Sequence, residues 1–337
     1  MASTILTDVN FQSETFAMQM QAAFTHKLEM LNSGAMLPFP EEIVSSNSTG
    51  YTVAIPRWNV LSGDSEQITN SSSTTVNNLT DIKDIGAWVE REKAWGADQM
   101  VAIVAGKDVT AEVARQIGEY WAGEVHKSML ATLTGVMTTA LASTHVYDAS
   151  PNVVSKNAVI AAKAKLGDNQ DKLTLAIMNS AVYNDALREQ ILTETPYADQ
   201  LAQTGAVGFL LGMRTFQSDL LTATAGVYPT YLLAPGSLGF KFRNRPTNSL
   251  SNANLATVNF GNIIVDIELN RVAKTAGGQD EIITRTSYLT HVPGVQFDGT
   301  VASNPTNAQL ATGTTWTKVQ TDNKLIPVVQ LLTGVSA

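Results

Sequence analysis

The chain of 337 residues contains no cysteine. Disulfide bonds and thiolate metal sites are therefore excluded, and any association of subunits depends on noncovalent contacts or on cross-links between other side chains. Charged residues are also scarce, at 15% of the chain, against about 25% in an average globular protein. A protein that covers much of its surface with copies of itself needs fewer surface charges than a monomer. The low charge therefore favours an oligomer.

Targeting signals and long apolar runs are missing as well. Met1–Asn10 lacks the basic flank and apolar stretch of a signal peptide, and the longest apolar run, Ala206–Met213, is too short to span a bilayer. We therefore expect no contact with a membrane. The formal net charge of −8 argues against tight nucleic-acid binding, which depends on Lys and Arg. An acidic wall can nevertheless enclose nucleic acid, because it repels the phosphates.

The sequence also lacks motifs for catalysis or cofactor binding. Its four histidines do not have metal-site spacing, and it contains no phosphate loop, dinucleotide fingerprint or zincin motif. Pro235–Gly239 resembles a nucleophile elbow, but its first glycine is one residue too close to the serine, so a plain β-turn is the better interpretation. Glu90 and Glu92 alternate with Arg91 and Lys93, which is typical of a solvated or intersubunit strand face. We expect no enzyme activity, no metal and no cofactor.

Hydrophobic residues make up 44% of the chain, enough for a folded core. Residues 10–32 carry apolar side chains at steps of three, four and five, which predicts an amphipathic helix. The two prolines in Met36–Val44 favour an extended arm after it. The apolar positions of the predicted helix are Phe11, Phe16, Met20, Phe24, Leu28 and Leu31.

A long β-hairpin is predicted next. Tyr51–Ile55 and Asp81–Trp95 have strand patterns on either side of a polar stretch, Leu61–Leu79. Pro56 is expected to limit the continuation of the first strand into a central ladder. Such a hairpin has too little apolar surface to be stable alone, so we expect it to lie on something else, with a neighbouring subunit as one candidate. The candidate intersubunit contacts are Trp58, Glu90, Arg91, Glu92 and Lys93.

Residues from Asp108 to about Ala142 predict one long helix. Ile117, Trp121 and Val125 lie on its apolar stripe and are the candidate core residues. At 1.5 Å per residue, about 30 residues form a rod of roughly 45 Å. Three glycines in this helix are expected where another backbone comes close, namely Gly118, Gly123 and Gly135.

Helices and strands alternate in the middle of the chain, and strands dominate its end. Helices are predicted near 157–166 and 180–192, with a buried strand near 173–178 and further strands near 226–234 and 238–243. Further strands follow, and Pro327 is expected to place the last of them at a sheet edge. The fold class is therefore α+β. The predicted late strands are Val258–Leu269, Asp280–His291, Thr315–Val319 and Leu325–Leu332.

Several patches, in this order, resemble the major capsid proteins of tailed bacteriophages with the Hong Kong 97-type fold. The most specific stretch is Ile85–Val136, with Lys93-Ala94-Trp95-Gly96 and Gly118-Glu119-Tyr120-Trp121-Ala122. Ala161–Asp185 is similar to the family in a second stretch. Tyr288–Val295 and the closing segments up to Leu331 complete the set. Each patch is weak alone, and the resemblance depends on their combination.

The resemblance implies a division into five parts. Residues 1–44 would be an N-terminal arm, and residues 45–97 an extended loop that overlaps a neighbour. Residues 98–151 would belong to a peripheral domain with a long spine helix. Residues 152–255 would form an axial domain at the symmetry axes, and residues 256–337 would complete the peripheral sheet.

The resemblance also implies a function. The chain would assemble through pentamers and hexamers into the icosahedral head shell of a double-stranded DNA phage, and would enclose the genome without sequence-specific binding. We expect a separate scaffold and a portal, with room for decoration proteins, assembly in the host bacterial cytoplasm and a final place in the virion. An encapsulin-type compartment, which encloses enzymes, is the alternative with the same fold. An α/β enzyme is the alternative from another class.

Overall fold

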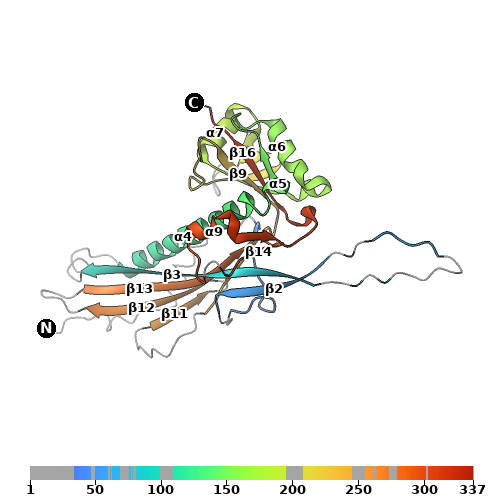
Figure 1. Ribbon diagram of the computed structural model, residues 1–337. Coiled ribbons are helices and arrows are strands. Elements are labelled where there is room, and N and C mark those ends of the chain that lie inside the picture. The colour runs from blue at the N-terminus through green and yellow to red at the C-terminus, as the bar shows by residue number, and fades with distance from the viewer. Residues whose placement is uncertain are drawn as a thin grey trace, which may run out of the picture.

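A computed structural model describes most of the chain from residue 34 onward. The described residues are 34–46, 50–59, 61, 63–68, 76, 78, 81–98, 109–194, 208–244, 255–260, 263–272, 279–300 and 303–336. Two seven-stranded sheets organise them, one in each of two bodies (Figure 1). We call the elongated body below the long helix the base, and the compact body above it the lobe. None of the described helices is long and apolar enough to cross a membrane.

The sheet of the base is built around its longest internal strand, β13. One edge of β13 pairs with β12 and, further along, with β10, and its other edge pairs with β3. Strand β3 continues beyond this sheet to pair with β2, which forms the predicted hairpin. The strands of the base are β1 (Met36–Pro38), β2 (Thr52–Trp58), β3 (Asp81–Asp98), β10 (Leu238–Phe242), β11 (Leu255–Phe260), β12 (Ile263–Val272) and β13 (Gln279–His291).

The sheet of the lobe has the strand order β4-β16-β9-β5-β8-β7-β6. All four residues of β5 are buried, as expected of a central strand that is covered on both faces. Leu211 and Gly212 have positive φ angles of 46° and 85° and make the two-residue turn between β7 and β8. The strands are β4 (Val146–Asp148), β5 (Leu175–Met178), β6 (Leu192–Glu194), β7 (Gly208–Leu210), β8 (Met213–Gln217), β9 (Tyr228–Leu233) and β16 (Val328–Thr333).

Side-chain caps start two of the described helices of the lobe. Ser155 caps α6 through the amide of Ala158, and Asn179 caps α7 through the amide of Ala181. These bonds satisfy amide groups that have no partner within the helix. The helices are α6 (Lys156–Lys163), which continues into the 3-10 segment η1 (Ala164–Lys172), and α7 (Ser180–Arg188).

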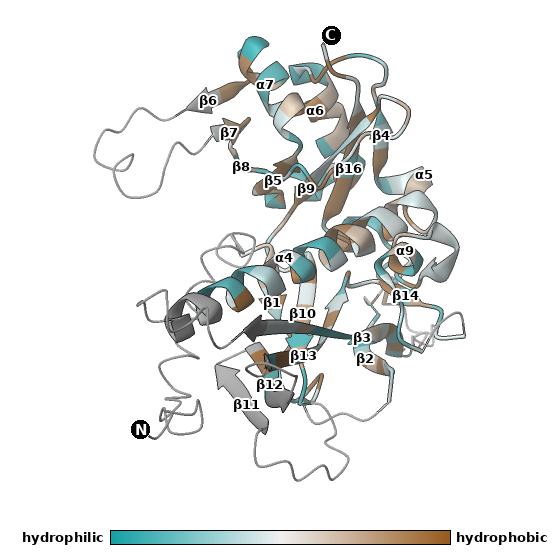
Figure 2. Ribbon diagram, turned by 90° about the vertical axis from the view of Figure 1, so that its left-hand side faces the viewer, coloured by the Kyte–Doolittle hydropathy of each residue, from teal (hydrophilic) through white to brown (hydrophobic). Residues whose placement is uncertain are grey.

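The long helix α4 (Val109–Thr138) lies between the two bodies (Figures 1 and 2). Its apolar side chains join one buried cluster with strands of the base and with β5, β9 and β16 of the lobe. The short elements at its C-terminal end are α5 (Ala142–His145), β14 (Val295–Phe297), α9 (Asn307–Leu310), η2 (Gly313–Thr315), β15 (Trp316–Lys318) and η3 (Asn323–Leu325). Helix α4 is therefore the common core of both bodies.

Strand pairing divides the chain differently from the expected parts at three strands. Strands β4 and β16 belong to the sheet of the lobe, although we assigned both to the peripheral part. Strand β10 belongs to the base, although we assigned it to the axial part. The Pro235-Gly236 turn therefore joins β9 of the lobe to β10 of the base. Local patterning predicts strands but carries no information about which distant strand pairs with them.

Only one of the two proline predictions was wrong. Pro56 lies inside β2, opposite Lys83, and β2 pairs only with β3 among the described strands, so it is not part of a central ladder, as expected. Pro327 precedes β16, which pairs on both sides with β4 and β9 and is therefore no edge strand. In each case the missing N–H falls where the ladder does not need it.

Other element predictions differ in their bounds. Val258–Leu269 is not one strand but parts of β11 and β12, which pair antiparallel. Helix α4 ends at Thr138 rather than near residue 142, and α7 ends at Arg188. The helix predicted for residues 10–32 lies outside the described residues.

Candidate functional site

The hairpin of β2 and β3 is the feature that projects furthest from the base (Figure 1). Thr52 lies opposite Ala87 and Trp58 opposite Asp81, while Trp88 and the residues after it pair with β13. Ile55, Asp84 and Ala87 are nevertheless buried, and Ile55 packs with Leu289 of β13, so only the part of the hairpin beyond these residues stands away from the base. Of the expected extended loop, residues 45–97, the last part from Trp88 onward pairs with β13.

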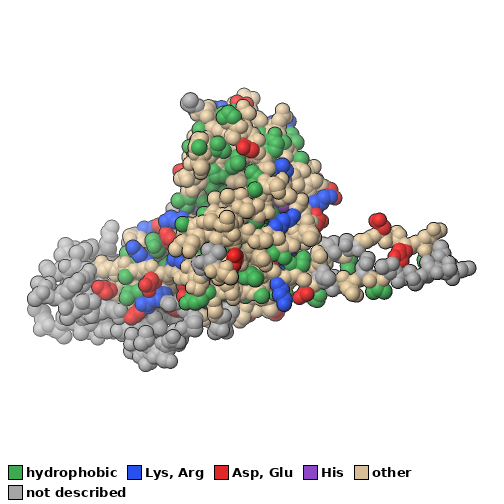
Figure 3. Space-filling view, viewed as in Figure 1, with side chains coloured by type: hydrophobic (Ala, Val, Ile, Leu, Met, Phe, Trp, Pro, Cys, Tyr) green, Lys and Arg blue, Asp and Glu red, His purple; other side chains and the backbone are tan. Residues whose placement is uncertain are grey.

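Large apolar side chains are exposed along the projecting part. Trp58 is 69% exposed, Leu61 73%, Ile68 97% and Val76 81%. In the space-filling view, hydrophobic and acidic side chains follow one another along this projection (Figure 3). Single exposed apolar residues are common, but a series of them on a thin projection indicates a surface that another molecule covers.

A buried arginine holds the hairpin at the point where it leaves the base. Arg243, 2% exposed, donates from Nε to Ser287 Oγ at 2.9 Å and from Nη2 to Glu90 Oε1 at 2.5 Å. It also donates to the carbonyl of Gly50, and its guanidinium lies 4.8 Å from the ring centroid of Trp88. These contacts join β10, β13 and both arms of the hairpin, so Arg243 sets where the hairpin leaves the base.

A second buried charge lies further along β3. Asp84, 1% exposed, accepts from the Gly294 amide at 2.8 Å and from Arg57 Nη1 at 3.3 Å. Nε2 of His291 is 3.9 Å away, too far for a hydrogen bond. Burial raises the pKa of Asp84, but the nearby His291 ring, the Gly294 amide and the Arg57 charge lower it more, so the net pKa lies below its ordinary value. A charged Asp84 therefore ties the hairpin to the end of β13.

Three of the four charged candidates for intersubunit contact pair with residues of their own chain. Glu90 pairs with Arg243, and Arg91 donates to the Pro305 carbonyl at 2.7 Å. Glu92 is 72% exposed beside Arg285 at 3.2 Å, and Lys93 is exposed. These pairings explain why the residues alternate in charge without any second subunit. Contact with a neighbour stays a prediction for all four and for Trp58.

The three candidate core residues of the long helix lie in the shared core. Ile117 is 3% exposed, and Trp121 and Val125 are each 1% exposed. Trp121 Nε1 donates to Thr284 Oγ1 of β13 at 3.0 Å, and its ring meets Tyr120 edge-on. The helix is thus held on the base by both packing and a hydrogen bond.

Sequence reasoning missed the buried polar residues. Arg243 follows the apolar strand β10, where a charge looks like a solvated strand end. Asp84 had a usable signal, because it interrupts a β-branched strand pattern between Ile82 and Ile85. Tyr231 gave no signal at all, since a tyrosine suits any strand.

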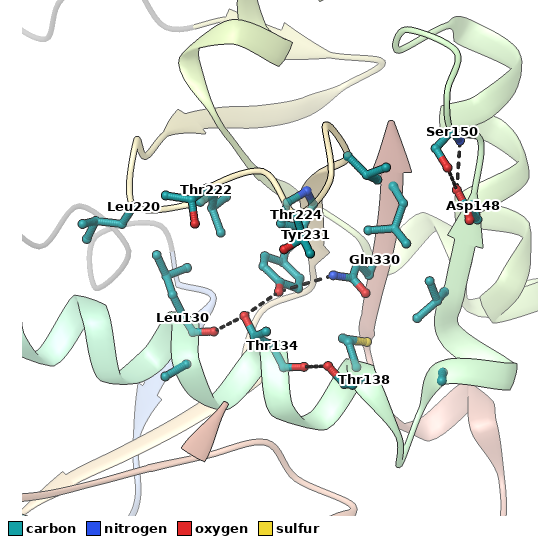
Figure 4. Close-up of a pocket in the computed structure, with 18 of the residues that line it drawn as sticks. Leu130, Thr134, Thr138, Asp148, Ser150, Leu220, Thr222, Thr224, Tyr231 and Gln330 are labelled. Atoms are coloured by element: carbon teal, nitrogen blue, oxygen red, sulfur yellow. Dashed lines mark hydrogen bonds between the residues drawn. The ribbon is translucent and has the colours of Figure 1, made fainter. Parts of the chain in front are cut away.

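A cleft lies between α4 and the lobe (Figure 4). Its volume is about 780 Å³. Leu130 and Thr134 of α4 line one side, the rim from Leu220 to Pro229 lines another, and residues of β4, β9 and β16 lie between them. Most of the lining is apolar, and Leu220 on the rim is 47% exposed. The arrangement suits an apolar segment better than a polar ligand.

One hydrogen-bonded group joins the two bodies on the floor of this cleft. The hydroxyl groups of Tyr231 and Thr134 lie 3.0 Å apart, and Gln330 Nε2 donates to the Tyr231 hydroxyl at 3.4 Å (Figure 4). Burial raises the pKa of Tyr231 to about 12, against the smaller effect of these two hydrogen bonds. The phenol therefore stays neutral and links α4 to β9 and β16.

His126 of α4 makes a second contact with the lobe, and from its lowered pKa we expect the folded subunit to lose stability in acid. Its Nε2 lies 2.8 Å from Ser218 Oγ, and burial lowers its pKa from 6.5 to about 4. The unfolded chain therefore binds more protons than the folded chain between these values, and stability falls as pH drops from 6.5 towards 4. We expect a loss of about 2 kcal/mol at pH 5 from this residue.

Urea unfolding of the unassembled subunit at pH 7.5 and pH 5 checks this expectation. His126→Asn removes the titrating ring, so the variant should lose about 2 kcal/mol less than the parent over the same interval. An equal loss in both proteins would show that His126 does not titrate as described.

Comparisons with known proteins agree with this architecture. A family model described as Gp13-like, major capsid protein 13-like, matches residues 57–329. The major capsid protein of Bacillus phage SPP1 is 26% identical over 295 residues, which cover 83% of this chain and 82% of that protein.

Two solved phage capsids share the fold at low sequence identity. The cyanophage Pam1 capsid has a TM-score of 0.56 at 12% identity, with 88% of each chain covered. The capsid of Ralstonia phage GP4 has a TM-score of 0.58 at 8% identity and covers 90% of this chain and 87% of that one.

The architecture is thus the Hong Kong 97-type fold of tailed-phage capsids, and the protein is a structural component of the virion that forms the capsid shell. The family match spans well over half of the sequence, from the hairpin to the last strand. The chain belongs to the Gp13-like family of phage major capsid proteins.

Proposed function

We propose that the projecting hairpin lies across a neighbouring subunit of the shell and that Trp58 is its main contact. The observation that carries the proposal is the series of exposed apolar side chains that begins at Trp58, beyond the buried Ile55. Trp is enriched among residues that dominate binding energy. Glu92 and Lys93 are exposed and would contribute at the rim of the contact.

The two bodies would have separate places in the shell. The base, with α4 as its spine, corresponds to the peripheral domain, and the lobe corresponds to the axial domain at the symmetry axes. Heterologous contacts between subunits form closed rings when the rotation from one subunit to the next adds up to a full turn. Pentamers and hexamers built in this way would join into an icosahedral shell. Individual contacts can be modest because many act together.

Other partners follow from the task of a phage head. We propose a separate scaffold, a portal, assembly in the host bacterial cytoplasm and enclosed DNA, with decoration proteins as a further class of partner. The net charge of −8 suits a wall that does not hold the genome tightly. An encapsulin-type compartment has the same architecture, but the matches to phage capsid proteins favour the phage head.

Trp58→Ser should abolish or strongly reduce shell formation without unfolding the subunit. The side chain is 69% exposed, so its loss removes little from the core, whereas a Trp at the centre of a contact typically contributes about 2 kcal/mol or more. Negative-stain microscopy gives the particle yield, and thermal melts of unassembled protein give the stability. Trp58→Phe is the matched control and should retain particles. Normal particles from Trp58→Ser would contradict the assignment.

Amide exchange of the hairpin should slow when shells form. Residues 63–68 are exposed in the single chain, and a two-stranded ribbon is marginal in water. We expect fast exchange there in unassembled protein and clear protection in particles. Peptides from buried β5 provide the internal control, because their exchange should be slow in both states. Equal exchange of 63–68 in the two states would mean that the hairpin is not covered.

A further inference from the structure

Residues 36–46, which we call the strap, run along the edge of β10 that faces away from β13. They begin as strand β1, which pairs with β10 in parallel, and the Phe39 amide continues this ladder by donating to the Phe240 carbonyl at 2.9 Å. Further on, the Asn244 amide donates to the Ser46 carbonyl at 2.9 Å. The strap is therefore tied to β10 and its continuation at both of its ends.

A charged contact holds the middle of the strap. Glu41 Oε2 lies 2.7 Å from Nζ of Lys241, whose side chain is 12% exposed, and Glu41 Oε1 accepts from the Ser46 amide at 2.6 Å. The Lys241 ammonium, followed by the amide and hydroxyl of Ser46, lowers the pKa of Glu41 to about 2, so the carboxylate stays charged near neutral pH. Lys241 also donates to the Phe39 carbonyl at 3.3 Å. These contacts give the strap one path over β10.

The apolar side chains of the strap complete a small buried cluster at the point where the hairpin leaves the base. Val44 is 0% exposed and packs in this cluster with Ile55 of β2, Trp88 of β3 and Leu289 of β13, while the half-buried Phe39 lies against it. Among the described strands β2 pairs only with β3. A two-stranded ribbon needs such packing to be stable, so the strap supplies part of what holds β2 in place.

Strand β10 has a glycine where the ring of Phe39 lies. A Cβ at position 239 would be 2.0 Å from Phe39 Cζ and 2.3 Å from Phe39 Cε2. Any other residue at position 239 would therefore push the ring away from β10. Gly239 thus allows the strap to lie close to β10 and to reach the hairpin cluster.

We propose that the strap sets the direction in which the hairpin leaves the base, with Phe39 and Val44 as the positioning residues. Where β3 no longer pairs with β13, strand pairing alone does not fix this direction, and the strap closes one side of the cluster that does. A hairpin that is already held in one direction loses less conformational freedom when it binds a partner. The proposal concerns the single subunit, so it stands or falls independently of the contact proposed for Trp58.

Distances between spin labels in the unassembled, full-length subunit test the proposal. The chain has no cysteine, so Leu61→Cys on the hairpin and Ile160→Cys on α6, both at exposed positions, can be labelled specifically. Double electron–electron resonance should give one narrow distance distribution for this pair. Gly239→Ala, which displaces the Phe39 ring, should broaden the distribution and speed amide exchange in residues 52–58 about fivefold or more.

Two controls separate a turned hairpin from a damaged base. Lys93→Cys with Ile160→Cys places the first label on the part of β3 that pairs with β13, so its distance distribution should stay unchanged by Gly239→Ala. Phe39→Ala removes the ring and should broaden the 61–160 distribution by itself. Because the space beside position 239 is then vacant, Gly239→Ala should have no additional effect in the Phe39→Ala background.

These measurements decide the proposal in both directions. Broadening of the 61–160 distribution alone, with no additional effect of Gly239→Ala after Phe39→Ala, supports it. A 61–160 distribution that is broad before any substitution, or that stays narrow after it, would overturn it. Broadening of the 93–160 distribution, or additive effects of the two substitutions, would also overturn it by placing the cause in the sheet of the base. If Gly239→Ala does not fold, Phe39→Ala, which adds no atom to β10, decides by the same distances.

Discussion

Trp121→Ala should destabilise the unassembled subunit by about 3–5 kcal/mol, a typical cost of truncating a buried Trp. The side chain is 1% exposed in the cluster that joins α4 to both bodies, and its Nε1 donates to Thr284 at 3.0 Å. Truncation leaves a cavity and removes the donor to Thr284 Oγ1, which keeps only its bond to the Lys93 carbonyl at 3.3 Å. Domains are usually stable by about 5–15 kcal/mol, so we expect a large fall in Tm and failure to assemble through loss of folding.

Glu92→Ala is the control for Trp121→Ala. Its carboxylate is 72% exposed and pairs with Arg285 at the surface, where such pairs contribute about 0–1 kcal/mol. Its melting curve should match the parent, and any effect should appear in assembly and its salt dependence. Thermal melts next to particle yields separate the two roles. A Trp121→Ala protein with the parent's melting curve would refute the burial argument, whatever its particles looked like.

Gly135→Ala should destabilise the subunit by about 3 kcal/mol or more, at the upper end of overpacking effects. A Cβ at this position would lie 2.0 Å from the Leu310 carbonyl oxygen and 2.7 Å from Trp316 Nε1. Trp316 donates to the same carbonyl at 2.7 Å, so the methyl group pushes on a backbone and on a buried hydrogen bond together. Differential scanning calorimetry of unassembled protein measures the loss.

Gly123→Ala in the same helix is the matched control, with the opposite sign. No atom of the described residues outside the helix lies within 4 Å of the Cβ position, so the substitution should stabilise the helix by up to about 1 kcal/mol through its higher propensity. If both substitutions shift Tm in the same direction, the close packing of α9 against Gly135 is not the reason why position 135 requires glycine.

These two glycines also show the limit of sequence reasoning about α4. We expected all three helix glycines where another backbone comes close, and the structure gives that reason for Gly135 and removes it for Gly123. The helix itself was predictable, because the repeat of apolar residues depends only on its own geometry. Which side chains pack against each face of the helix depends on segments distant in the sequence, such as Leu310 and Trp316 beside Gly135.

The sequence by itself determined the local elements and the family. The strands of the hairpin, the long helix with its buried Trp121, and the α+β class follow from periodicity and turn residues, and the spread of similar patches indicated the Hong Kong 97-type fold. These features are local or additive along the chain, so one sequence suffices to read them.

Only the tertiary structure decided which strand joins which sheet and where the charges pair. Strand β16 enters the lobe and β10 enters the base, and the charges of Asp84 and Arg243 become buried at the base of the hairpin. Pairing between distant strands and the desolvation of a charge depend on partners that no local window contains. The same holds for the cleft, since α4, β9 and β16 form it only once the two bodies pack on one helix.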